Sequence, residues 1–194
     1  MVAGSETTTP LIEWAMAEIM QSHYIMKRVQ EELAEIIGLD NIVEESNLPK
    51  LQYLDATIKE TFRLHPVVPL ILRRLPRQVC IVGGYTIAKR CTRFLNVWSI
   101  HRDPQYWDNL LEFNPGRFLT NKYDFKGRNL NFIPFGSGRR LCPGVPLAEK
   151  MQMYILVSLL HSFDWSLPEG EKHDLSENFG ITLKKREPLI VVPS

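Results

Sequence analysis

A ten-residue stretch, FGSGRRLCPG at residues 135–144, constrains this chain more than any other feature of its sequence. It combines glycines, arginines, a proline and a cysteine. Gly136 and Gly138 free the backbone for tight turns and for close approach to a partner. Pro143 suits a first helical turn, so the pattern predicts that Cys142 stands at the N-terminus of the next helix. The helix dipole and the free N–H groups there favour a thiolate.

A thiolate at this position is compatible with a nucleophile, a redox sensor or a metal ligand. The alternative is an inert, buried cysteine in a glycine-rich turn. Two features argue for function: Arg139 and Arg140 are hard to bury unpaired, and Phe135 offers a flat aromatic wall. A nucleophile would need a distant base, and no residue set in the chain suggests the base and oxyanion arrangement of a hydrolase.

Composition excludes several other classes. The three cysteines, Cys80, Cys91 and Cys142, form no C-x-x-C pair, which argues against a disulfide framework and a structural zinc site. Lys and Arg total 23 against 22 Asp and Glu, so the net charge of +1 gives no sign of nucleic-acid binding. No apolar run approaches the roughly 20 residues of a membrane span, and no targeting pattern opens the chain.

Hydrophobic periodicity predicts a mainly α protein with small β-sheets (α+β). Two helices are expected over residues 8–37, with Pro10 in the first turn, Ser22 capping the second helix and Gly38 ending it. A further helix should end near His65, because Pro66 pushes the preceding residue out of helical geometry. The other expected elements are a hairpin at 78–87 around Gly83-Gly84, a strand at 93–100, loops at 107–123, a helix at 144–163 with Ala148, Met151, Ile155, Leu159 and Phe163 on its apolar stripe, and short strands at 181–185 and 188–193.

The cysteine stretch resembles a family signature. Phe135, Gly138, Arg140, Cys142 and Gly144 occupy all five fixed positions of the F-x-x-G-x-R-x-C-x-G pattern of cytochrome P-450 enzymes. The resemblance implies that the Cys142 thiolate is the axial ligand of the iron of haem b. It further implies that Arg140 pairs with a haem propionate, that Phe135 packs near the sulfur, and that the glycines let the loop lie against the porphyrin.

A second motif comes from residues that alone would indicate only a surface ion pair. Glu60 and Arg63 lie three residues apart on one helix face. In the family, this E-x-x-R pair joins an arginine of a P-x-R-F segment, and FNPGRF supplies Pro115, Arg117 and Phe118 here. The resemblance implies that Glu60, Arg63 and Arg117 form a buried ionic lock behind the haem.

The first residues resemble the long helix over the distal face of the haem. AGSETT is similar to the family's A/G-G-x-D/E-T-T/S motif, which gives Glu6 and Thr7 a role in proton delivery and lets Gly4 leave room for dioxygen. Taken alone, the same residues favour capping near a helix start.

Three shorter segments resemble parts of the substrate and haem pocket. The resemblance places Val67 and Val68 of HPVVPL, and Ile181 and Leu183 of GITL, in the substrate pocket, and Arg74 near a propionate. Considered without the family, these side chains are as readily explained as ordinary core or surface residues.

As a whole, the chain looks most like plant microsomal members such as flavonoid and terpenoid hydroxylases. The resemblance implies a monooxygenase that inserts one oxygen atom of O2 into a small lipophilic substrate and releases the other as water. NADPH would supply the electrons through a flavoprotein reductase. Arg139 and Lys150 either belong to a docking face for that reductase or are simply solvated charges, and no nucleic-acid partner is expected.

Complete family members are more than twice as long. Residues 1–194 are therefore expected to be the C-terminal part of the P-450 domain, from the distal helix onward, without the N-terminal half and its membrane anchor. The complete protein would sit on the cytosolic face of the endoplasmic reticulum membrane. The segment IAKRCTR also departs from the family's I-P-K-G-T-R pattern. The alternative is accordingly a non-catalytic fragment or degenerate copy with at most weak haem binding.

Overall fold

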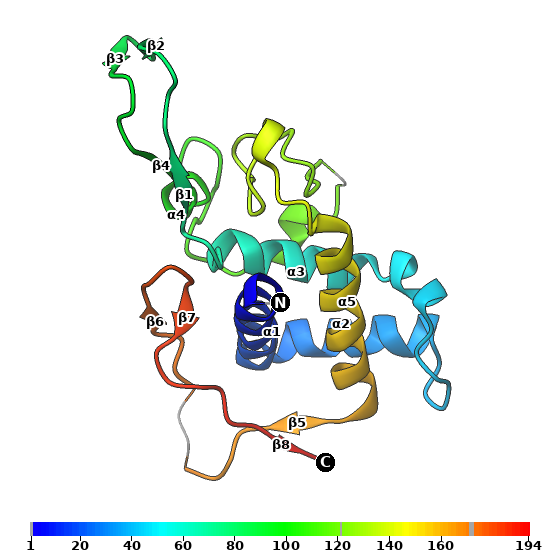
Figure 1. The fold of residues 1–194 in the computed structure, drawn as a ribbon. Coiled ribbons are helices and arrows are strands. Elements are labelled where there is room, and N and C mark those ends of the chain that lie inside the picture. The colour runs from blue at the N-terminus through cyan, green and yellow to red at the C-terminus, as the bar shows by residue number, and fades with distance from the viewer. Residues whose placement is uncertain (1, 121, 171–172) are drawn as a thin grey trace.

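The structure, a computed structural model, describes residues 2–120, 122–170 and 173–194. Helices dominate this part of the chain (Figure 1). The longer ones are α1 (Val2–Gln21), α2 (His23–Ile36), α3 (Gln52–Leu64) and α5 (Val145–Ser162). The shorter ones are the α-helix α4 (Val97–Ile100) and the 3-10 helices η1 (Glu45–Lys50), η2 (Pro115–Phe118) and η3 (Gly138–Arg140).

The strands form small antiparallel pairs. These are β1 (Leu70–Arg74) with β4 (Arg93–Asn96), β2 (Cys80–Val82) with β3 (Tyr85–Ile87), β5 (Trp165–Ser166) with β8 (Val192–Pro193), and β6 (Glu177–Asn178) with β7 (Lys184–Lys185). Figure 1 shows the β2–β3 hairpin projecting away from the helices and the β6–β7 pair beside α1. The predicted fold class, mainly α with small sheets, is confirmed, as is the hairpin at Gly83-Gly84, where both glycines have positive φ.

Helix α3 is the most deeply buried element. Eleven of its thirteen residues are buried, including the polar Thr57, Glu60 and Arg63. It packs against α1, α2 and α5 and against η2. Since a helix with a polar composition gains little from burial alone, its charged side chains must find partners inside the protein.

Predicted boundaries of two helices are confirmed. The Ser22 hydroxyl accepts a hydrogen bond from the Ile25 N–H at 3.4 Å and caps α2, which Gly38 follows with φ of 89°. Helix α3 ends at Leu64, and His65 is its C-cap, as the following proline requires. Before α3, the Asn47 side chain belongs to the capping box of η1.

Other predictions of helix boundaries and faces are wrong. Helix α1 starts at Val2, so Pro10 lies in its interior, where packing of the surrounding turns outweighs the lost hydrogen bond. The segment 93–100 changes from strand to helix at Asn96, whose side chain accepts a hydrogen bond from the Ser99 N–H at 3.0 Å.

Helix α5 departs from prediction in two ways. Its N-cap is Gly144 and Pro146 lies in its first turn, so Pro143 is outside the helix and Cys142 precedes the N-cap by two residues. The predicted apolar stripe is also wrong, because Met151 and Phe163 are exposed. A helix that is apolar around most of its circumference gives no periodic signal for its buried face. The buried residues are Val145, Gln152, Met153, Leu156, Val157 and Leu160.

Within the described residues, no helix combines the length and the apolar character needed to cross a membrane.

Candidate functional site

The cysteine stretch folds into a closed loop. The Cys142 N–H donates to the carbonyl of Phe135 at 3.0 Å, and the Leu141 N–H donates to the carbonyl of Gly138 at 3.1 Å. These bonds close the loop around η3 and leave Cys142 as an exposed free thiol. Arg140, in the same loop, is exposed as well. The loop therefore presents a sulfur and a cation to its surroundings.

Glycines make this loop possible in two different ways. Gly136 and Gly138 adopt left-handed φ values of 81° and 64°, which side-chain-bearing residues rarely adopt. A Cβ added at Gly138 would meet no atom within 4 Å, so open space adjoins the backbone there. Gly127 is different, because its Cβ would lie 2.5 Å from the carbonyl oxygen of Gly136. The Ser137 hydroxyl also donates to the Gly127 carbonyl at 2.8 Å, so this neighbouring turn braces the loop.

Phe135 fixes the start of the loop to the core. Its ring centroid lies 5.0 Å from that of Phe62 on α3 and 5.4 Å from that of Phe125, the latter in edge-to-face geometry. Aromatic pairs at these separations add to the stability gained by burial.

Behind the loop, Arg63 is fully buried and uses all five of its N–H donors. Its Nε and Nη2 each donate to the Glu60 carboxylate at 2.8 Å. Its remaining N–H groups donate to three backbone carbonyls, those of His101 at 3.1 Å, Leu110 at 2.8 Å and Glu112 at 3.0 Å. One side chain thus joins α3 to α4 and to the loop before η2.

Glu60, which is also fully buried, completes the group. It accepts a hydrogen bond from the Asn114 N–H at 2.9 Å, and the Arg117 Nε lies 3.4 Å from its Oε1. Burial raises the pKa of the Glu60 carboxyl, and the hydrogen bond and charge of Arg63 oppose that rise. The structure therefore brings together Glu60, Arg63 and Arg117, the three residues of the predicted ionic lock.

His101 connects this network to the chain that enters the cysteine loop. Its side chain is fully buried, with Nδ1 3.2 Å from the Phe62 carbonyl and Nε2 accepting a hydrogen bond from the Ile133 N–H at 2.9 Å. Since Nε2 accepts, Nδ1 carries the proton and the ring is neutral. Burial, aided by the nearby charges of Arg63 and Arg102, lowers the pKa of His101 to about 3.

The predicted distal residues lie on the first turns of α1. Glu6 is exposed, and its Oε2 lies 3.0 Å from the Nζ of Lys184 on β7. Thr7 is half-buried, and its hydroxyl donates to the Gly4 carbonyl at 3.5 Å. The contact with Lys184 joins α1 to the C-terminal hairpin.

The residues predicted to line the substrate pocket come from two segments that the structure brings together. The Leu183 N–H donates to the Val67 carbonyl at 2.8 Å, and both side chains are buried. Val68 is half-buried, whereas Ile181 is 85% exposed at the tip of the turn between β6 and β7. Arg74 ends β1, and its side chain lies outside the described part of the structure.

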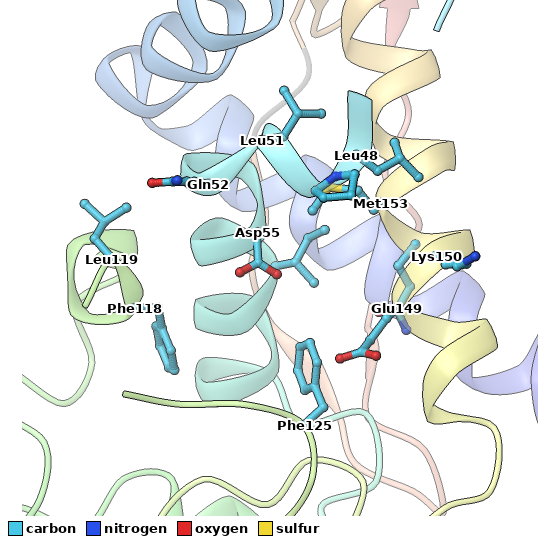
Figure 2. A pocket seen from close by; sticks show the side chains of 13 residues that line it. Leu48, Leu51, Gln52, Asp55, Phe118, Leu119, Phe125, Glu149, Lys150 and Met153 are labelled. Atoms are coloured by element: carbon cyan, nitrogen blue, oxygen red, sulfur yellow. The ribbon is translucent and has the colours of Figure 1, made fainter. Parts of the chain in front are cut away.

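A cavity of about 470 Å³ lies between η1, α3, α5 and the side chains of Phe118, Leu119 and Phe125 (Figure 2). Figure 2 shows the carboxylates of Asp55 and Glu149 pointing toward one space beside the Phe125 ring. Burial and the charge of Asp55 raise the pKa of Glu149. Lys59 already pairs with Asp55 at 2.6 Å, and Lys150 pairs with Glu45. Lys150 and Phe118 line this cavity, whereas the residues predicted to hold the haem, to deliver protons and to bind substrate do not.

The exposed residues of the cysteine loop fit a haem. The loop presents a single free thiol, open space at Gly138 and the exposed Arg140. These features suit a flat macrocycle that brings its own nitrogen donors and carries carboxylates.

The residues that sequence reasoning missed are His101 and Gly127. The segment NVWSIHRDP resembles plant members of the family but indicates no role for its histidine, and a lone glycine in a loop indicates none for Gly127.

The family model described as cytochrome P-450 matches residues 1–192. Among curated relatives, a geraniol 8-hydroxylase of Swertia mussotii is 47% identical and a flavonoid 3'-monooxygenase of Crocosmia x crocosmiiflora is 45% identical; each match covers 98% of this chain and 39% of the relative. A zebra fish cytochrome P-450 solved with progesterone superposes with a TM-score of 0.89 at 34% identity, over 99% of this chain and 44% of that one. The chain thus spans about two fifths of the length of these proteins.

The buried pair predicts a large effect of a single substitution. In Glu60→Gln, Arg63 loses its counterion and faces an amide that also carries N–H donors. We expect the free energy of unfolding, measured by urea denaturation, to fall by about 3–5 kcal/mol. The control is Glu31→Gln in the exposed Lys27–Glu31 pair, 3.8 Å apart, where the expected loss is below about 0.5 kcal/mol. Equal losses in the two variants would contradict the assigned role of the Glu60–Arg63 pair.

His101 predicts a pH dependence of stability. Its pKa is about 3 in the folded protein and 6.5 ordinarily, so between these values only the unfolded chain binds a proton there. Lowering the pH from 6.5 toward 3 should therefore reduce the free energy of unfolding by about 1.4 kcal/mol per pH unit through this residue. Urea denaturation of His101→Gln from pH 7 to pH 4 should show that its free energy of unfolding falls less steeply with pH, by that amount per pH unit, than that of the wild type. Parallel plots of the free energy of unfolding against pH for the two proteins would refute the lowered pKa of His101.

Proposed function

The chain belongs to the cytochrome P-450 family, and we propose that it carries the haem-binding part of a monooxygenase that hydroxylates a small lipophilic plant metabolite. The observation that supports this most is the closed loop that presents the Cys142 thiol beside the open surface at Gly138. The names of the relatives, which describe a terpenoid hydroxylase and a flavonoid monooxygenase, support the class of substrate.

Cys142 would hold the haem through its sulfur, and Arg140 would pair with a propionate. When bound, haem supplies the activation of dioxygen, and a thiolate ligand favours cleavage of the O–O bond. The residues around Cys142 would keep its sulfur in place. The bond between the Cys142 N–H and the Phe135 carbonyl, the packing of Phe135 and the brace at Gly127 all restrict the loop.

Glu6 and Thr7 would deliver protons on the opposite face. The Glu6 carboxylate is exposed, so it can exchange protons with water, and its ion pair with Lys184 restricts its position. Thr7 is one residue further along α1 and half-buried, where its hydroxyl can pass a proton inward. The overall reaction consumes dioxygen, two electrons and two protons per substrate, and yields the hydroxylated product and water.

The substrate would lie against Val68 and Ile181, on the segments that the Leu183–Val67 hydrogen bond holds together. The electrons would come from NADPH through a flavoprotein reductase, and the complete protein would act at the endoplasmic reticulum membrane. Arg139 is exposed within the cysteine loop and would contribute to a docking face for the reductase, whereas Lys150 is paired with Glu45.

A haem titration of the purified chain tests this proposal. Reduction under carbon monoxide should give the Soret band of a thiolate-ligated carbonyl haem. Cys142→Ala should abolish that band, because no other sulfur lies in the loop. Cys91→Ala is the matched control, since Cys91 lies between β3 and β4, and it should leave the band unchanged. A band that is indifferent to Cys142, or no haem binding at all, would refute the proposal and favour a non-catalytic fragment.

A further inference from the structure

A second group of buried charges lies at the C-terminal end of α3, apart from the network behind the cysteine loop. His65 is 5% exposed, and its ring is stacked on Trp14 of α1 with centroids 3.9 Å apart. Its Nε2 lies 2.6 Å from the Glu18 carboxylate on α1, and its Nδ1 lies 3.1 Å from the Glu177 carboxylate on β6. One imidazole thus joins three elements that are distant in sequence.

The two contacts define the chemistry of this group, which we call the His65 cluster (His65, Glu18, Glu177 and Arg102). A neutral imidazole has one N–H, and a carboxylate only accepts hydrogen bonds. Both ring nitrogens face carboxylate oxygens, so both contacts are hydrogen bonds only when the ring carries two protons and a positive charge. In that state a cation lies between two anions in a buried setting, where charge-assisted hydrogen bonds are strong.

The charges around His65 agree with this arrangement. Arg102 Nη2 lies 3.3 Å from the Glu177 carboxylate, and the Trp98 indole N–H donates to the same carboxylate at 3.4 Å. Burial raises the pKa of Glu177, but the hydrogen bond and charge of His65 and the charge of Arg102 outweigh it, so the net shift is downward. Lys185 on β7 is a further cation nearby, 5.3 Å from the Trp14 ring.

The His65 cluster lies next to both segments of the proposed substrate pocket. His65 immediately precedes the Pro66–Val68 stretch, and Glu177 begins the turn that carries Ile181 and Leu183. The Leu183 N–H bonds to the Val67 carbonyl at 2.8 Å, and the Trp14 indole N–H donates to the Leu183 carbonyl at 3.4 Å. Beyond these anchors, the tip of the turn, with Phe179 and Ile181, is exposed.

We propose that His65 is a positioning residue for substrate binding: as an imidazolium between Glu18 and Glu177, it holds the turn at residues 178–184 against residues 67–68 and so sets the shape of the pocket wall. This inference rests on the proposed function for the identity of the pocket. The Cys142 loop is supported separately, by Arg63 and His101. A change at His65 should therefore alter the pocket and spare the sulfur.

Hydrogen exchange at the Leu183 amide tests the structural half of the proposal and needs no haem. His65→Gln removes the positive charge and leaves Glu18 and Glu177 without it, so we expect exchange about tenfold faster, the equivalent of losing one charge-assisted hydrogen bond. His161→Gln is the matched control, because His161 Nε2 bonds to the Gly38 carbonyl at 2.7 Å, at the opposite end of α5 from the cysteine loop, and should leave Leu183 unchanged.

A double variant separates charge from ring packing. His65→Gln with Glu18→Gln removes the uncompensated carboxylate and lets two amides bond to each other, while the stacking on Trp14 is lost in both variants. We expect Leu183 exchange in the double variant to return to within about threefold of the wild-type rate. An unchanged rate in His65→Gln, or no recovery in the double variant, would overturn the charge-based role of His65.

Azole binding to the haem-loaded chain tests the functional half. Imidazole needs only the iron, whereas 4-phenylimidazole also needs room at the pocket wall. In His65→Gln, we expect the spectral dissociation constant of 4-phenylimidazole to rise about tenfold and that of imidazole to change less than twofold, with the carbonyl Soret band retained. Equal changes for both azoles would overturn the positioning role. Absence of haem binding in the wild type would count against the proposed function, and the exchange experiment would still decide whether His65 fixes the turn.

Discussion

The buried Arg63 guanidinium makes five hydrogen bonds, which fix the position of α3 relative to residues 101–112. Two of them hold Glu60 on the same helix, and three end on carbonyls of His101, Leu110 and Glu112, which lie 38 to 49 residues further along the chain. Each donor of a buried arginine that lacks a partner costs stability. Residues 101–114 are therefore held along one path. That path places His101 where its Nε2 accepts a hydrogen bond from the Ile133 N–H, just before the cysteine loop begins.

The two buried charged clusters of α3 contact different parts of the protein. Glu60 and Arg63 face the chain that leads to Cys142, while His65, at the C-cap, faces α1 and the C-terminal turn. Both clusters are ionic and buried, so each favours one arrangement of its side chains over the alternatives. Removing a single partner from either cluster lowers the free energy of unfolding. Such contacts would hold the Cys142 sulfur in place beside a flat cofactor. They would also keep the shape of the pocket wall.

The local features of this arrangement could be predicted from neighbouring residues, and among the long-range contacts only those within family motifs, such as Glu60 with Arg117, could be predicted. Ser22, the His65-Pro66 step and Gly83-Gly84 act through neighbouring residues, so their caps and turns were predictable. The motifs around Cys142 and Glu60 were recognisable because their spacing is fixed. The buried face of α5 could not be predicted, because the helix is apolar on several sides. The roles of His101 and Gly127 depend on contacts with segments that sequence spacing does not bring together.

The central claim is that the Arg63 network positions the cysteine loop, and hydrogen exchange in Arg63→Lys tests it most directly. Lysine keeps the charge but lacks the planar fork that reaches Glu60 and three carbonyls at once. We expect the amides of Ile133 and Cys142 to exchange at least about tenfold faster, relative to the Ser194 amide, which bonds to the Asp164 carbonyl next to the β5–β8 pair. If these amides keep their protection relative to Ser194, other contacts hold the loop and Arg63 does not position it.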